Sequence, residues 1–125
     1  MSQACIKALN LHASEVLPVK VEVDISPGIP QISIVGMADQ AIREASLRVR
    51  TALKASGYQI PRAKILVNLS PSGMRKSGSG FDLAIALGIL QASGQIFLAA
   101  VKDSVFVGEL SLEGQIHPVK GMVAY

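Results

Sequence analysis

The sequence is poor in cysteine, in aromatic residues and in long hydrophobic runs. Cys5 is the one cysteine among 125 residues, which excludes an internal disulfide and a cysteine-based zinc site. Aromatic residues make up 4% and tryptophan is absent, so the core must be built from valine, isoleucine, leucine and alanine. No apolar run approaches the roughly 20 residues that span a bilayer, and the first residues lack the charged-then-apolar order of a signal peptide. We therefore expect a protein of the reducing cytoplasm with no membrane partner.

What the sequence does have is an uneven distribution of charge. Residues 43–76 carry eight basic residues and one acid, a charge of +7, whereas the remainder carries four basic and eight acidic residues, a charge of −4. The eight basic residues are Arg43, Arg48, Arg50, Lys54, Arg62, Lys64, Arg75 and Lys76. A concentrated basic segment indicates a nucleic acid or an acidic partner, and the alternative is an ordinary solvated face.

Alternation of apolar and polar residues predicts several strands. It is clearest in residues 16–25. The turn sequence Ser26-Pro27-Gly28 then predicts that residues 29–35 return beside them as the second strand of a hairpin. Further strands are predicted at residues 4–11, 64–69, 104–110 and 115–119. The largely apolar strand at 64–69 is expected at the centre of the sheet.

The first predicted helix covers residues 39–56 and ends before Gly57. It combines an apolar stripe with a basic side, because Arg43, Arg50 and Lys54 share one face.

The second predicted helix covers residues 81–93 and is apolar nearly all round, so we expect it to be buried. Asp82 is expected to lie near the free N–H groups of its first turn, and Leu87→Ala should cost about 2–5 kcal/mol. The order of elements predicts an α+β fold in which a mixed sheet carries two main helices on one face. A single domain would cover residues 1–125.

A Gly-rich loop, SPSGMRKSGSG, precedes the second helix and could in principle bind an anion. Gly73 and Gly78 have the spacing of a Walker loop, but Ser79 and Gly80 stand where that loop needs Lys and Ser or Thr. We therefore reject nucleotide binding of this type.

A serine nucleophile is the second hypothesis for the loop. Ser77 or Ser79 would need a base, and Lys76, His117 and Lys120 are the candidates. The alternative is that these serines provide turn geometry and cap the helix.

Three stretches together resemble the N-terminal domain of the Mg-chelatase-like ATPases known as ComM or YifB. They are the run from Pro30 to Arg62, with VGM and RVRTALKASGY, the run AKILVNLSPSGMRKSGSGFDLAIALGIL, and the hairpin VGELSLEGQIHPVKG. The resemblance covers essentially the whole chain. It implies the ribosomal-protein-type α+β fold, similar to the Lon protease catalytic domain and the GHMP kinases. It also implies that an AAA+ motor domain, absent here, belongs to the natural chain.

The resemblance further implies that catalysis has been lost. Lon-like domains carry a serine just before the second helix and a lysine after the hairpin, and these places fall at about Gly80 and Val123 here. Ser79 and Lys120 are displaced from them along the chain, and the phosphate-holding Gly-Ser-Ser of the GHMP kinases is also not kept. No catalytic residue is therefore expected.

We thus expect a ChlI-like, non-catalytic N-terminal accessory domain of a ComM-like AAA+ ATPase. The resemblance implies that such ATPases form ring-shaped motors that act in DNA branch migration during natural transformation and recombination. The expected partners are its own AAA+ domain, neighbouring subunits of the ring, and DNA. ATP and Mg²⁺ would bind only in the AAA+ domain, and this domain would hold no cofactor and no metal. The alternatives are a residual Ser–Lys hydrolase and a purely structural interaction module.

Nine residues form the predicted site. The side chains expected to contact DNA or a partner are Arg43, Arg50, Lys54, Arg75 and Lys76. The loop residues expected beside them are Gly73, Gly78, Ser79 and Gly80.

Overall fold

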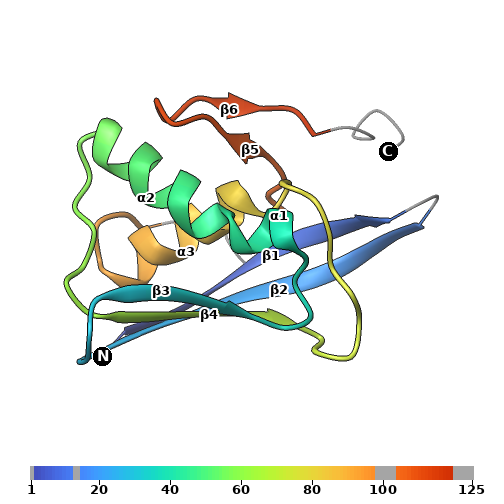
Figure 1. Ribbon diagram of the computed structural model, residues 1–125, viewed down its shortest axis with the longest axis horizontal. Helices are drawn as coiled ribbons and strands as arrows, with labels where there is room; N and C mark the ends of the chain where they lie inside the picture. Colours follow the sequence, from blue (N-terminus) through green and yellow to red (C-terminus); the bar gives the residue numbers. More distant parts are fainter. Residues whose placement is uncertain (1, 13–14, 98–103, 120–125) are drawn as a thin grey trace.

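The computed structural model describes residues 2–12, 15–97 and 104–119, which form three layers (Figure 1). A four-stranded mixed sheet is the lowest layer in that view, helices lie on it, and a short hairpin lies above the helices. The strands of the sheet are β1 (Ser2–His12), β2 (Glu15–Ser26), β3 (Gln31–Val35) and β4 (Lys64–Ser70).

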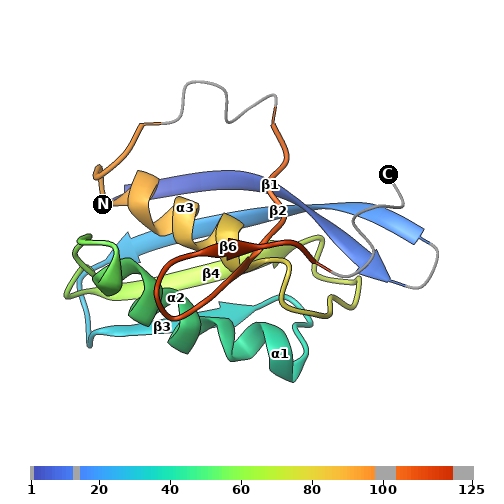
Figure 2. The same ribbon diagram turned by 90° about the horizontal axis from the view of Figure 1, so that it is seen from above.

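Three helices cover one face of the sheet. They are α1 (Gln40–Arg43), α2 (Ala45–Ala55) and α3 (Asp82–Ala92). Figure 2 shows α2 and α3 side by side across the strands, with the hairpin of β5 (Glu109–Leu110) and β6 (Ile116–His117) above them. The predicted α+β class, with two main helices on one face of a mixed sheet, is confirmed. None of the described helices is long and apolar enough to cross a membrane.

The order of the strands differs from the prediction. The sheet runs β1-β2-β4-β3, so the hairpin is formed by β1 and β2, and residues 29–35 do not return beside β2. Instead β3 pairs in parallel with β4, which pairs antiparallel with β2. The reason is the connection between β3 and β4, because a helical crossover brings parallel strands side by side. The central position of β4 is as predicted.

The last two predicted strands are much shorter than expected. Only β5 and β6 form a two-stranded sheet in the described part of residues 104–119. Before them, Phe106 donates its backbone N–H to the carbonyl of Lys7 at 2.9 Å. Val105 makes an isolated parallel bridge to Lys7. The segment therefore runs along the outer edge of β1 before it turns up to the hairpin (Figure 2).

The core lies between the sheet and the helices. One face of β2 and β4 supplies it with fully buried aliphatic side chains, and α3 packs on them as predicted. At Gly88 the approach is so close that an added Cβ would lie 2.6 Å from Cγ2 of Val23. Leu87 is only partly buried, whereas Ile85 and Ile89 are fully buried. The predicted loss of 2–5 kcal/mol on truncation to alanine therefore applies better to Ile85 and Ile89 than to Leu87.

The predicted helix of residues 39–56 is divided at Glu44 into α1 and α2. In a continuous helix the carbonyl of Ala41 would accept the N–H of Ala45. Here Nη2 of Arg48 donates to that carbonyl at 2.8 Å. We attribute the interruption to this side-chain bond. The helix ends as predicted, with Gly57 in the left-handed region at φ 90°.

Candidate functional site

The second half of the Gly-rich loop is held in place by hydrogen bonds to other elements. Asn10, buried on β1, donates Nδ2 to the carbonyl of Arg75 at 2.9 Å and accepts the N–H of Ser77 at 3.3 Å. Asp39 accepts the N–H of Gly78 at 3.1 Å and that of Ile42 at 2.9 Å, so one carboxylate caps α1 and fixes the loop. These contacts determine where the loop side chains point.

Lys76 does not lie on the surface, contrary to its predicted role as a contact for DNA or a partner. Its residue is 0% exposed, and its Nζ donates to the carbonyls of Gly36 and Pro71. Burial lowers the pKa of Lys76 below the ordinary value of 10.5. The side chain therefore joins the loop to the end of β3 and to the exit of β4. The physical reason for the correction is that these carbonyls, inside the protein, need a donor.

The structure gives Ser79 a partner that is none of the predicted bases. Its Oγ donates to Oε1 of Glu109 at 2.7 Å. Among the described candidates for a base, Lys76 is engaged with backbone carbonyls, and the exposed His117 lies on β6 with no hydrogen bond to Ser77 or Ser79. Lys120 and the position of Val123 lie outside the described residues.

Gly80 lies in close packing beside the serines. A Cβ at this position would lie 3.3 Å from Cγ2 of Val119 and 3.4 Å from Cγ1 of Val107. A cavity of about 230 Å³ beside the loop is lined by Leu9, Leu11, the loop residues 77–81, Glu109 and Val119. Three of the four predicted loop residues, Gly78, Ser79 and Gly80, thus line one cavity. The fourth, Gly73, has open space around it.

Arg48 and Asp82 form a partly buried ion pair that was not predicted from the sequence, with the Arg48 side chain 21% exposed. Arg48 donates Nε to Oδ2 of Asp82 at 2.8 Å and Nη2 to Oδ1 at 2.9 Å. Asp82 is 0% exposed and also accepts the N–H of Leu110 at 3.1 Å, so it ties α2 and β5 to the start of α3. The hydrogen bonds that Arg48 donates to Asp82 raise the pKa of Arg48 above its ordinary value. Arg48 also makes an i,i+4 ion pair with Glu44, at 3.8 Å, which the helical spacing of the two residues allows.

Asp82 lies in the first turn of α3, as predicted, but its carboxylate forms this pair instead of accepting the N–H groups of its own helix. A sequence signal for it existed, because Asp82 is the one charged residue in an otherwise apolar, buried helix. A buried carboxylate requires a cationic partner or several donors.

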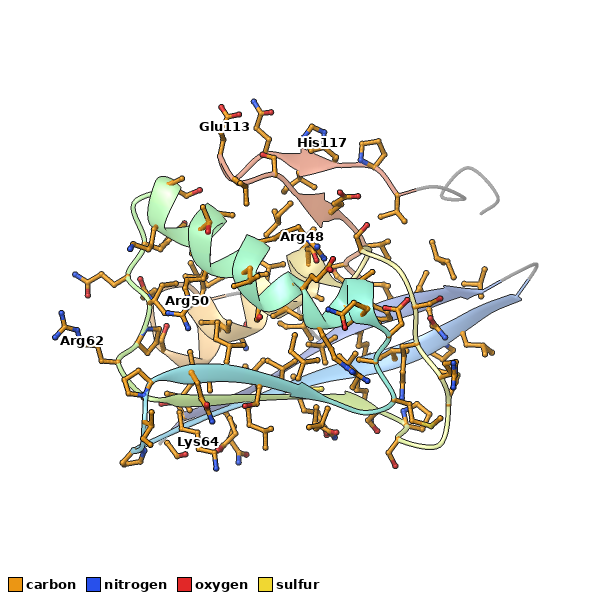
Figure 3. The ribbon with its side chains drawn as sticks, viewed as in Figure 1. Arg48, Arg50, Arg62, Lys64, Glu113 and His117 are labelled. Atoms are coloured by element: carbon orange, nitrogen blue, oxygen red, sulfur yellow. The ribbon has the colours of Figure 1, made fainter. Side chains whose placement is uncertain are left out.

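The remaining predicted cations separate into two clusters. Arg43 and Arg75 lie together in a depression at α1, which we call the loop cluster. Arg50 and Lys54 line a different groove, at the far end of α2, together with Arg62; we call these three the groove cluster. Figure 3 shows Arg50 between α2 and β3, with Arg62 and Lys64 at the same end of the molecule. Arg62 lines the groove although it was not among the predicted contact residues, and it belongs to the basic segment.

Internal and solvent-facing cations can be told apart by their partners. Of the basic residues in 43–76, and counting only the described part of the chain, Arg48 alone lies within 4.0 Å of a carboxylate oxygen. The loop cluster and the groove cluster thus make no ion pair within this distance among the residues that the structure describes, although Asp39 lines the same depression as the loop cluster. The positive charge of these surfaces attracts anions.

A metal centre finds no support in the described residues. No group of three or more His, Cys, Asp or Glu side chains in residues 2–12, 15–97 and 104–119 could hold an ion. The expectation that the domain binds no cofactor stays a prediction.

Comparisons with known proteins identify the family. Residues 21–125 match the family described as subunit ChlI of Mg-chelatase. An uncharacterized protein YifB of Escherichia coli is 40% identical over 117 residues, which are 94% of this chain and 22% of that protein. Competence protein ComM of Haemophilus influenzae is 42% identical over 105 residues, 84% of this chain and 21% of that protein. The chain therefore spans about a fifth of the length of these relatives. It belongs to the ChlI family and is a relative of YifB and ComM.

Proposed function

We propose that this chain is a non-catalytic accessory domain of a ComM-like AAA+ ATPase and that it contributes DNA contacts to that motor. The similarity to a protein named for competence supports a role in natural transformation. Recombination and a cytoplasmic location are further parts of the proposal. In this proposal ATP and Mg²⁺ bind in an AAA+ domain outside the 125 residues, and the partners are that domain, neighbouring ring subunits and DNA.

The proposal rests on one observation. Some cations of the basic segment are bonded inside the fold, and others lie on the protein surface. Arg48 and Lys76 have partners inside the fold, whereas the loop cluster and the groove cluster form no ion pair among the described residues. Asp39 lines the depression of the loop cluster, and no acidic residue lines the groove of the groove cluster. Exposed cations of this kind bind the phosphate backbone of DNA whatever its sequence. The proposed DNA contacts are therefore electrostatic and non-specific.

A titration against salt tests the DNA contacts. The anisotropy of a labelled DNA should rise with protein concentration and give a dissociation constant of about 10⁻⁴–10⁻⁶ M at physiological salt, with weaker binding at higher salt. Lys76→Ala is uninformative here, because it removes a buried side chain. Arg43→Gln and Arg75→Gln test the loop cluster instead. Absence of any complex at low salt would overturn the DNA proposal.

An assembly function is the second candidate, favoured by exposed leucine and isoleucine side chains on the helical side. Leu47 on α2 is 67% exposed, and Leu112 and Ile116 at the hairpin are 57% and 58% exposed. Such side chains are suited to contacts with the motor domain or with a neighbouring subunit. If the protein binds no DNA, light scattering of the chain mixed with its motor domain should detect a complex, weakened by Leu112→Ser.

A further inference from the structure

A groove of about 780 Å³ opens at the end of α2. Its walls are the second half of α2, the connection from α2 to β4 and the chain that follows α3. It is lined by three cations, Arg50, Lys54 and Arg62, and by no acidic residue. The groove is therefore strongly cationic and large enough for part of a polyanion.

The wall opposite α2 is fixed by one side chain. Gln95, which follows α3, accepts the N–H of Gln59 at 3.0 Å and donates to the carbonyl of Gln59 at 2.8 Å. Its Nε2 also donates to Oγ of Ser93 at 2.9 Å. These bonds hold the connection between α2 and β4 against the end of α3. The shape of the groove is thus set before any ligand binds, which lowers the entropy lost on binding.

An aromatic side chain lies among the cations. Tyr58 lines the groove and is 39% exposed, and its backbone N–H is fixed by the carbonyl of Leu53 at 2.9 Å. The backbone of Tyr58 is thus held in place on this cationic surface, and the exposed part of its ring can contact a planar ligand. Grooves that bind single strands combine cations along the backbone with aromatic rings under the bases.

We propose that this groove binds single-stranded nucleic acid, with the groove cluster contacting phosphates and Tyr58 stacking on an unpaired base. The inference rests on the proposed DNA function and adds the surface, the residues and the strandedness. A duplex would use the cations but would offer no unpaired base to Tyr58. An acidic peptide would likewise leave the ring without a planar partner. The combination of ring and cations therefore favours a single strand.

The test uses the 125-residue chain and a labelled oligothymidylate of about 20 nucleotides, longer than one typical single-strand site. Arg50→Gln/Arg62→Gln removes two cations of the groove cluster. Arg43→Gln/Arg75→Gln removes two cations of the loop cluster and is the matched control for charge. Glutamine keeps much of the aliphatic stem, so packing changes little. Melting curves check that each variant is folded. Two further variants, Tyr58→Phe and Tyr58→Leu, test the ring without changing the charge.

The expected result is a loss of affinity concentrated at the groove. Arg50→Gln/Arg62→Gln should weaken binding about tenfold or more and lower the salt slope by about 1.4 units, for two phosphate contacts on a single strand. The control pair should have a clearly smaller effect. Tyr58→Leu should weaken oligothymidylate binding by at least about fivefold while leaving duplex binding unchanged. Tyr58→Phe should bind like the wild type.

Different outcomes overturn different statements. If DNA binds but the groove variant matches the wild type or the control, the groove assignment is wrong and the proposed DNA function stands. If an Asp- and Glu-rich peptide of equal charge competes as well as oligothymidylate and Tyr58→Leu has no effect, the single-strand assignment is wrong. If no nucleic acid binds at low salt, both proposals are wrong.

Discussion

At the scale of single residues, the ion pair of Arg48 and Asp82 makes the sharpest prediction. Arg48→Met should leave the fully buried Asp82 carboxylate without its cation, and removing one partner of such a pair costs about 3–5 kcal/mol. Urea denaturation measures the change. The double variant Arg48→Met/Asp82→Leu should recover much of the loss, because an apolar pair can replace a buried ion pair.

Arg50→Met is the control for this prediction, because Arg50 has no carboxylate partner among the described residues. It should change the free energy of unfolding by no more than about 0.5 kcal/mol. Equal effects of Arg48→Met and Arg50→Met would show that the pair does not stabilise the fold.

The burial of Lys76 predicts that the free energy of unfolding depends on pH in the alkaline range. Burial lowers its pKa in the folded chain below 10.5, so between the lowered value and 10.5 the unfolded chain binds more protons than the folded chain. Stability contributed by this group should therefore rise with pH across that window, whereas below it both states are protonated and the contribution is constant. Lys76→Met lacks this titration. The measurement is the difference in unfolding free energy between wild type and Lys76→Met from about pH 7 upward. A difference that stays flat up to pH 10.5 contradicts the prediction.

Residue types and local spacing predicted part of the site. The Glu44–Arg48 pair follows from the helical period, and Gly57 follows from the rules of helix ends. The Arg48–Asp82 pair joins residues 34 positions apart, and the burial of Lys76 depends on carbonyls of two other segments. Such contacts depend on how the elements pack, so a charge count alone placed Lys76 on the surface.

At the scale of elements, the contact of α3 with β2 predicts that alanine at Gly88 destabilises the fold. Helix propensity alone would predict the opposite sign. Ala is about 1 kcal/mol better than Gly in a helix interior. At Gly88, however, the added methyl group would meet Val23 at 2.6 Å, so Gly88→Ala should destabilise by about 1–3 kcal/mol. Thermal unfolding measures it. Gly73→Ala is the matched control, because nothing lies within 4 Å of its added Cβ, and it should be close to neutral.

The prediction of strands and helices from the sequence was better than the prediction of their partners. The alternation in β2 and the apolar character of α3 are local and were interpreted correctly. The error concerned β3, because Pro27 and Gly28 mark a turn without specifying which strand lies beside the next one. That choice depends on β4, whose first residue comes more than 30 positions later, at Lys64.

At the scale of the whole molecule, the loop and the hairpin predict an absence of hydrolysis. Ser79 is bonded to Glu109, and no described lysine or histidine activates it. The chain should therefore turn over neither ATP nor peptides, and a fluorophosphonate probe should not label it. Labelling that disappears in Ser79→Ala would revive the hydrolase hypothesis and identify the nucleophile. A parent protein containing the AAA+ domain is the positive control for ATP turnover.

The position of β4 between β2 and β3 also has a consequence during synthesis on the ribosome. β1 and β2 are complete at Ser26, but the strand that pairs with the other edge of β2 ends only at Ser70. At about 5–20 residues per second, the nascent hairpin waits roughly 2–9 s with that edge open. Open edges of apolar strands pair with other chains unless charges discourage it. Lys20, Glu22 and Asp24 alternate with the apolar residues of β2, so the strand carries charges of the kind that discourage such pairing.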